Sequence, residues 1–140
     1  MCRPRVVLDT NVLVAALRSS RGPAFHLLSL LGTGHFETAV SVPLVFEYED
    51  VLAREVIGIT ASAAADVIDY LCQVAHRQEV HFLWRPFLKD PKDDFVLELA
   101  VASPSETIVT YNVKDFEGSA RFGVRVVRPA ELLAELGVEP

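Results

Sequence analysis

Acidic side chains lie beside the ends of apolar segments in separate parts of the chain. They are Asp9, Glu47, Asp93, Asp94 and Asp115. Carboxylates a few ångströms apart repel by roughly 4 kcal/mol per pair at an effective dielectric constant of about 20, so a cluster of them is costly unless cations fill it. Mg²⁺ and Mn²⁺ accept carboxylate oxygens and keep water ligands, which leaves positions for a phosphate oxygen and a hydrolytic water. If the fold brings these acids together, the chemistry they favour is metal-dependent phosphodiester hydrolysis.

The elements that must position these acids alternate between strands and helices. The apolar run Val6–Leu8 predicts a buried strand, and it leads directly through Asp9 into the apolar stretch 12–17, which predicts a helix. Short strands that are apolar on both faces and separated by helices predict a three-layer α/β/α domain with a central parallel sheet. Further strands are expected at 37–40, 80–83, 107–110 and 124–127, and further helices begin near Pro23, Pro43, Ser62, Phe95 and Ala130.

Composition and charge limit what such a domain can be. The 140 residues, 51% of them hydrophobic, suffice for one sizeable core and not for two, so we expect a single domain over residues 1–140. The chain has no run of eighteen apolar residues and no secretory leader pattern, which predicts a cytoplasmic protein without a membrane segment. A formal net charge of -6 argues against RNA binding by phosphate neutralisation alone. The acidic excess is either an ordinary solvated surface or a cluster of carboxylates that meets a polyanion through bound Mg²⁺ or Mn²⁺.

The carboxyl ends of the strands are where the acids are expected to meet. In open parallel sheets, ligands bind beyond these ends, near the point where the strand order reverses. Asp9 and Asp115 follow predicted strands, Asp94 begins a buried helix, and Glu47 lies about one turn into the helix from Pro43. The sequence therefore predicts that four acids distant in the chain converge at one edge of the sheet.

Each acid also has an ordinary structural interpretation. Asp9 is well placed to cap a helix, one of Asp93 and Asp94 must cap the next one, and Asp115 suits a turn. Helical periodicity does not distinguish Glu47 from Glu49. The convergence of the acids, and not any one of them, indicates a site.

Several ordered blocks of the chain resemble the PIN domain family, and within it the VapC-type toxins of bacterial toxin-antitoxin pairs. The opening VVLDTNVLVAAL is similar to the family's first strand and aspartate, and DPKDDFVLELA resembles its third acidic segment. TYNVKDF is similar to the family's threonine-x-asparagine-x-x-aspartate-phenylalanine block. SVPLVFEYEDVLAR and FGVRVVRPAELL resemble the second acidic segment and the closing strand and helix.

The resemblance implies a ligand set and an activity. Its metal ligands are Asp9, Glu47 in place of Glu49, and Asp94, with Asp115 as the fourth acid. Asn112 stands where many relatives have an aspartate. The implied activity is RNA cleavage with Mg²⁺ or Mn²⁺ by a homodimer that a cognate antitoxin protein neutralises. The residues implied to support the acids are Thr10, Asn11, Asp93, Thr110 and Asn112.

Two other functions remain open at this point. A catalytically weak or inactive PIN-like module that binds RNA or serves as a scaffold is compatible with Asn112. A phosphotransfer domain is less compatible, because aspartate-nucleophile phosphatases need a second aspartate two positions after the first, where this chain has Asn11. The basic and aromatic candidates for RNA contacts are Arg18, Arg21, Lys92, Tyr111, Lys114 and Phe116.

Overall fold

The strands pair side by side in one parallel sheet, as the sequence predicts. The computed structural model describes residues 4–55, 61–80, 91–103 and 105–138. Its strands are β1 (Arg5–Leu8), β2 (Glu37–Val40), β3 (His76–Arg77), β4 (Thr107–Val109) and β5 (Arg125–Val127). Their order is β3-β2-β1-β4-β5, and every neighbouring pair is parallel. The chain builds outward in one direction from β1 and later in the other, so the switch point lies between β1 and β4.

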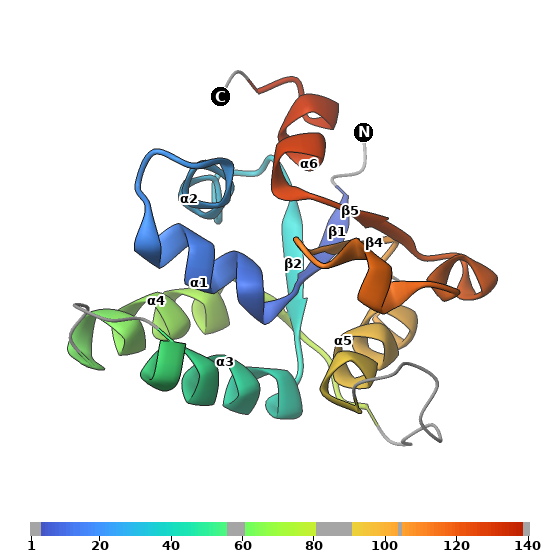
Figure 1. The fold of residues 1–140 in the computed structure, drawn as a ribbon, viewed down its shortest axis with the longest axis horizontal. Helices are drawn as coiled ribbons and strands as arrows, with labels where there is room; N and C mark the ends of the chain where they lie inside the picture. The colour runs from blue at the N-terminus through green and yellow to red at the C-terminus, as the bar shows by residue number, and fades with distance from the viewer. Residues whose placement is uncertain (1–3, 56–60, 81–90, 104, 139–140) are drawn as a thin grey trace.

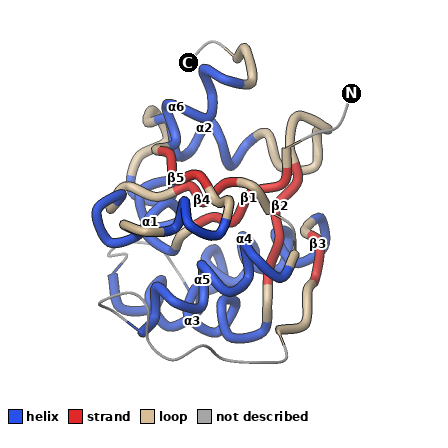
Figure 2. Tube along the Cα trace, turned by 90° about the vertical axis from the view of Figure 1, so that its right-hand side faces the viewer, coloured by secondary structure: helices blue, strands red, loops and turns tan. Residues whose placement is uncertain are grey.

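Helices cover both faces of this sheet. They are α1 (Thr10–Arg18), α2 (Pro23–Ser29), α3 (Val42–Glu55), α4 (Ala61–Val74), α5 (Pro91–Ala102) and α6 (Pro129–Glu135), with 3₁₀ helices η1 (Val113–Phe116) and η2 (Ser119–Phe122). Figure 1 shows α1 starting where β1 ends. In Figure 2, α2 and α6 lie above the strands, and α3, α4 and α5 lie below them. The predicted three-layer α/β/α architecture with a central parallel sheet is therefore confirmed.

The core lies between the sheet and its helices. Val6 and Val7 of β1 and Ile108 of β4 are 0% exposed, which is why these strands lack the polar alternation of a half-exposed sheet. Leu13 of α1 and Leu97 of α5 are also fully buried. Among the helices of the described residues, none is long and apolar enough to cross a membrane.

The third strand differs from the sequence prediction. A strand was expected at 80–83, but Val80 is not in a strand, and residues 81–83 lie outside the described part of the chain. The sheet instead takes up His76 and Arg77, which pair with Ala39 and Val40 of β2. Because β3 is an edge strand with half-buried and exposed residues, it needs no apolar run, and a search for apolar runs misses it.

Truncating a valine tests how much the packing of β1 contributes to stability. Val7 is 0% exposed, whereas Val42, at the start of α3, is 68% exposed. We expect Val7→Ala to lower the free energy of unfolding by about 2 kcal/mol, from the lost methyl groups and the cavity left behind. The matched Val42→Ala change should cost less than about 0.5 kcal/mol. Urea unfolding of the two variants measures both values, and equal losses would contradict the assignment of β1 to the core.

Candidate functional site

Asp9 lies where β1 ends and α1 begins. Its backbone is extended, with φ -69 and ψ 153, and its N–H donates to the carbonyl of Val109 in β4 at 2.9 Å. The side-chain Oδ1 accepts a hydrogen bond from the Thr10 N–H at 2.8 Å, which satisfies one of the free N–H groups in the first turn of α1. The ordinary capping role and a position at the switch point therefore coexist in one residue.

Side chains from α1 and from the end of β4 hold the second oxygen of Asp9. Thr110 Oγ1 donates to Asp9 Oδ2 at 2.7 Å, and Asn11 Nδ2 approaches the same oxygen at 3.3 Å and Thr110 Oγ1 at 3.1 Å. Asn11 Oδ1 accepts from the backbone N–H of Tyr111 at 3.2 Å. The backbone N–H of Asn112 donates to Thr110 Oγ1 at 3.0 Å. These bonds tie the carboxyl ends of β1 and β4 together and fix the orientation of the carboxylate.

The electrostatics of Asp9 show which other acids are near it. Asp9 is 7% exposed, and burial raises the pKa of its carboxyl group above the ordinary value. The hydrogen bonds from Thr110 and Thr10 lower this pKa, and the charges of Asp115 and Glu47 raise it. Acids on η1 and α3 thus act on the same buried carboxylate.

The structure distinguishes Glu47 from Glu49, which helical periodicity does not. Glu47 is half-buried and acts electrostatically on Asp9. Glu49 is exposed, and its charge instead contributes to the raised pKa of the Cys72 thiol, where burial is the larger cause. Glu47 is therefore the acid of α3 that faces the Asp9 side of the helix.

The first turn of α5 carries the remaining acids. Asp93 and Asp94 lie in this turn, but their side chains, like that of Lys92, fall outside the described part of the structure. The helix packs against β1 and β4 and contacts η1, which carries Asp115. Asp94 as a ligand and Asp93 as a cap or supporting residue remain predictions.

The donor set around Asp9 fits a hard divalent cation. The described bonds occupy three of the roughly four lone-pair positions of the carboxylate, which leaves one position on Oδ1 for a further partner. Oxygen ligands and excess negative charge are what Mg²⁺ and Mn²⁺ select. Among the described side chains, no three of His, Cys, Asp or Glu are grouped closely enough to hold an ion by themselves, and this set does not include Asp94.

A separate groove of about 900 Å³ opens beyond the carboxyl ends of β2 and β3. Its walls include Val42 and Phe46 of α3, Cys72 of α4, and Arg77 with Val80. None of the candidate acids lines it, and its mainly apolar walls offer few oxygen ligands. The candidate chemistry therefore belongs to the acids around Asp9 and not to this groove.

Two residues near the site are not among the candidates from the sequence, and one candidate, Phe116, is wrong. Tyr48 is not among the candidates from the sequence, yet its hydroxyl donates to the Leu8 carbonyl. Arg128 follows β5 directly, at the carboxyl edge of the sheet. Phe116, proposed to stack on bases, is 1% exposed and belongs to the core.

Fold and site together define a class, an α/β domain whose parallel sheet carries a buried aspartate at its switch point with further acids around it. A model of the PIN domain matches residues 5–114, so the chain belongs to the PIN domain family, as the sequence blocks suggested. PIN domains are generally nucleases that use divalent metal ions.

One solved structure shows the same fold in a complex. The chain is similar to one in the crystal structure of VapBC2 from Rickettsia felis bound to a DNA fragment from their promoter, with a TM-score of 0.57 and 16% identity. The similarity covers 87% of this chain and 96% of that chain. At this identity it demonstrates the fold alone. No curated protein sequence matches the chain.

The raised pKa of Asp9 predicts how its substitution affects stability. The folded chain holds the Asp9 proton more tightly than the unfolded chain, so this contribution to stability is full below the unfolded-state pKa of about 3.9 and is lost as the pH rises through the folded-state pKa. Without metal, the melting temperature of Asp9→Asn should therefore rise relative to the unsubstituted protein from about pH 4 to neutrality. Thermal unfolding in EDTA across this range measures the difference.

Adding Mn²⁺ at neutral pH provides the control for that experiment. An ion that binds only the folded state raises the melting temperature of the unsubstituted protein, and this increase should be lost in Asp9→Asn. If the melting temperature of Asp9→Asn fell relative to that of the unsubstituted protein as the pH increased, the pKa of Asp9 would not be raised in the folded chain.

Proposed function

We propose that this chain is a metal-dependent ribonuclease that hydrolyses RNA phosphodiester bonds, with Asp9, Glu47, Asp94 and Asp115 binding Mg²⁺ or Mn²⁺. One observation carries the proposal. The buried Asp9 carboxylate is fixed by Thr110 and lies in the field of two further acids, Glu47 and Asp115, from other elements. Such an arrangement is unfavourable without a cation, and it occurs at the edge where α/β sheets bind their ligands.

The residues around Asp9 would bind the metal ion or orient its ligands. A bound Mg²⁺ or Mn²⁺ ion would lower the pKa of the attacking water and stabilise charge on the departing oxygen. Thr110 and Asn11 hold Asp9 Oδ2, and the Thr10 N–H holds Oδ1, so the carboxylate is aimed before any ligand arrives. Asn112 contributes a backbone N–H to Thr110, and its side chain is exposed.

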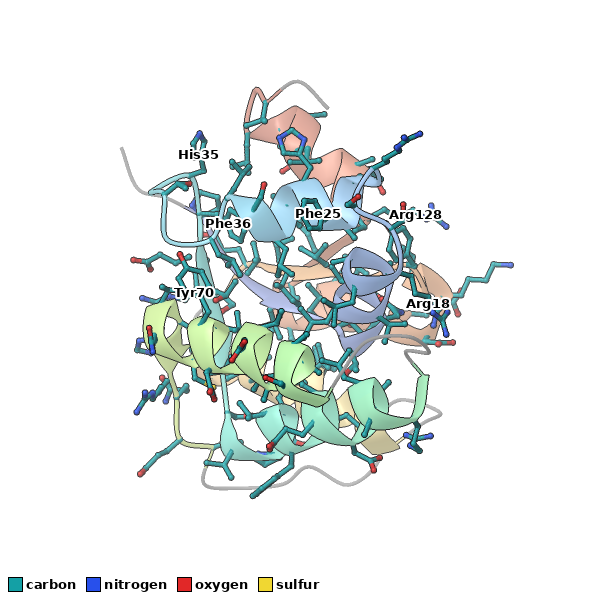
Figure 3. The ribbon with its side chains drawn as sticks, turned by 90° about the vertical axis from the view of Figure 1, so that its left-hand side faces the viewer. Arg18, Phe25, His35, Phe36, Tyr70 and Arg128 are labelled. Atoms are coloured by element: carbon teal, nitrogen blue, oxygen red, sulfur yellow. The ribbon has the colours of Figure 1, made fainter. Side chains whose placement is uncertain are left out.

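RNA would meet this edge through basic side chains beside the acids. Arg128 follows β5, and the Thr110 N–H bonds to the carbonyl of Val127 just before it, at 2.9 Å. Figure 3 shows Arg18 and Arg128 on the same side of the molecule. Tyr111, which follows β4, is half-buried and packs against the core. Cationic side chains on this side of the molecule, together with bound metal ions, would offer contacts to the phosphates of a single-stranded RNA.

We also propose that the chain is the toxin component of a toxin-antitoxin pair, acts as a homodimer in the cytoplasm, and is neutralised by a cognate antitoxin. The similarity of its fold to a chain of the VapBC2 structure supports this assignment. Light scattering on the purified chain should give twice its mass of 15.4 kDa. A monomer at all concentrations up to about 100 μM would exclude a stable homodimer.

An inactive RNA-binding or scaffold module is the alternative, because Asn112 removes one acid that many relatives carry. The nuclease and the scaffold differ in whether RNA is cleaved when Mn²⁺ is present. A scaffold binds RNA equally well with and without Mn²⁺ and leaves it intact.

Cleavage of total cellular RNA with and without Mn²⁺ tests the nuclease. We expect new RNA ends that depend on Mn²⁺, and a loss of more than about 100-fold in rate for Asp9→Asn and Glu47→Gln, since residues that only orient ligands contribute about 10–100-fold. The exposed Glu49→Gln, on the same helix, is the matched control and should retain the rate. Undiminished Mn²⁺-dependent cleavage by Glu47→Gln would remove Glu47 from the site.

A further inference from the structure

We propose that Tyr48 is a positioning residue for the metal-binding acids, because its hydroxyl fastens α3, which carries Glu47, to the last carbonyl of β1, beside Asp9. This inference rests on the proposed metal site and adds a residue that touches neither substrate nor metal. In this proposal the Tyr48 hydroxyl sets the distance between the carboxylates of Glu47 and Asp9.

The contact joins two elements far apart in the chain. Tyr48 is 0% exposed, and its Oη donates to the carbonyl oxygen of Leu8 at 2.5 Å, across 40 positions of sequence. Leu8 is itself 1% exposed, so water does not replace the bond easily. The tyrosine ring accounts for packing, since phenylalanine would fill the same space, and the hydroxyl accounts for the bond alone.

The strand pairing explains why this carbonyl takes a side-chain donor. The register of β1 with β4 extends to Leu8 and Val109. The register of β1 with β2 ends earlier, at Val6 and Thr38. The Leu8 carbonyl therefore lies beyond the last pair on the β2 side, and a buried carbonyl needs a partner. The Tyr48 hydroxyl is that partner, so α3 is held against the strand end where β1 and β2 cease to pair.

The hydrogen bond joins the sequence neighbours of the two acids. Leu8 is the residue directly before Asp9, and Tyr48 is the residue directly after Glu47. A hydrogen bond between these two neighbours links the backbones of both acids by a short path. Loss of the hydroxyl lets the end of β1 and the second turn of α3 shift relative to one another. The shift changes the distance between the two carboxylates and therefore their joint affinity for a cation.

Tyr48→Phe, with Tyr70→Phe as the matched control, tests the inference. Tyr70 Oη also donates to a backbone carbonyl, that of Leu31 at 2.9 Å. Figure 3 shows Tyr70 on the side of the molecule opposite Arg18 and Arg128. Direct titration of the full, folded chain with Mn²⁺ should give an affinity about 10-fold weaker for Tyr48→Phe and within about twofold of the unsubstituted protein for Tyr70→Phe. RNA cleavage by Tyr48→Phe should approach the normal rate when Mn²⁺ is raised to saturation, unlike that by Asp9→Asn.

The outcomes separate this inference from the proposed function. If the unsubstituted chain binds Mn²⁺ and Tyr48→Phe binds it equally well, the tyrosine is only structural and the inference fails alone. If the unsubstituted chain binds no Mn²⁺, both fail. Should Tyr48→Phe not fold, NMR of ¹³C-labelled tyrosine in the unsubstituted protein decides. The Tyr48 resonance should shift on addition of Mg²⁺ while that of Tyr70 does not, and an unmoved Tyr48 resonance overturns the inference.

Discussion

The burial of a single carboxylate at the end of β1 is the constraint on which the rest of the site depends. A buried charge is costly unless hydrogen bonds surround it, and Asp9 receives them from the Thr10 N–H, from Thr110 and from Asn11. The Thr110 bond exists only because β4 lies next to β1. The strand order is therefore a requirement of the site as well as of the core, since a sheet with another neighbour beside β1 would leave Asp9 Oδ2 without its closest donor.

The same carboxylate is also repelled by two other acids. Glu47 and Asp115 act on Asp9 from α3 and η1, and both raise its pKa, in the same direction as burial. A residue selected only to cap α1 would need neither neighbour. Structural acids are usually placed near cations, whereas the charges that act on Asp9 from the described residues, those of Glu47 and Asp115, are both negative. Mutual repulsion around a well-ordered carboxylate is in keeping with the proposed cation site.

The sequence predicts what depends on apolar patterning and on strand ends, and it fails where tertiary geometry decides. The buried strands, the parallel sheet and the position of Asp9 follow from patterning, whereas β3 does not, because His76 and Arg77 form a polar edge strand. Glu47 and Glu49 are equivalent by helical period, and only the packing of α3 against α1, α4 and α5 separates them. Phe116 resembles a surface aromatic in sequence, but the 3₁₀ helix η1 turns it into the core. The part of Asp94 stays a prediction from the resemblance.

Asn11 shows why the geometry disfavours an aspartate-nucleophile phosphatase and agrees better with the proposed nuclease. Its side chain donates through Nδ2 toward Asp9 and Thr110 and accepts through Oδ1 from the Tyr111 N–H, so both halves of the amide are used and its orientation is fixed by its partners. An aspartate at this position, which a phosphatase of the aspartate-nucleophile type requires, could accept from Tyr111 but could not donate to Asp9. It would also add a charge beside a carboxylate whose pKa is already raised. Asn11 thus disfavours phosphotransfer at this strand end, and it also orients the Asp9 carboxylate that the proposed nuclease needs.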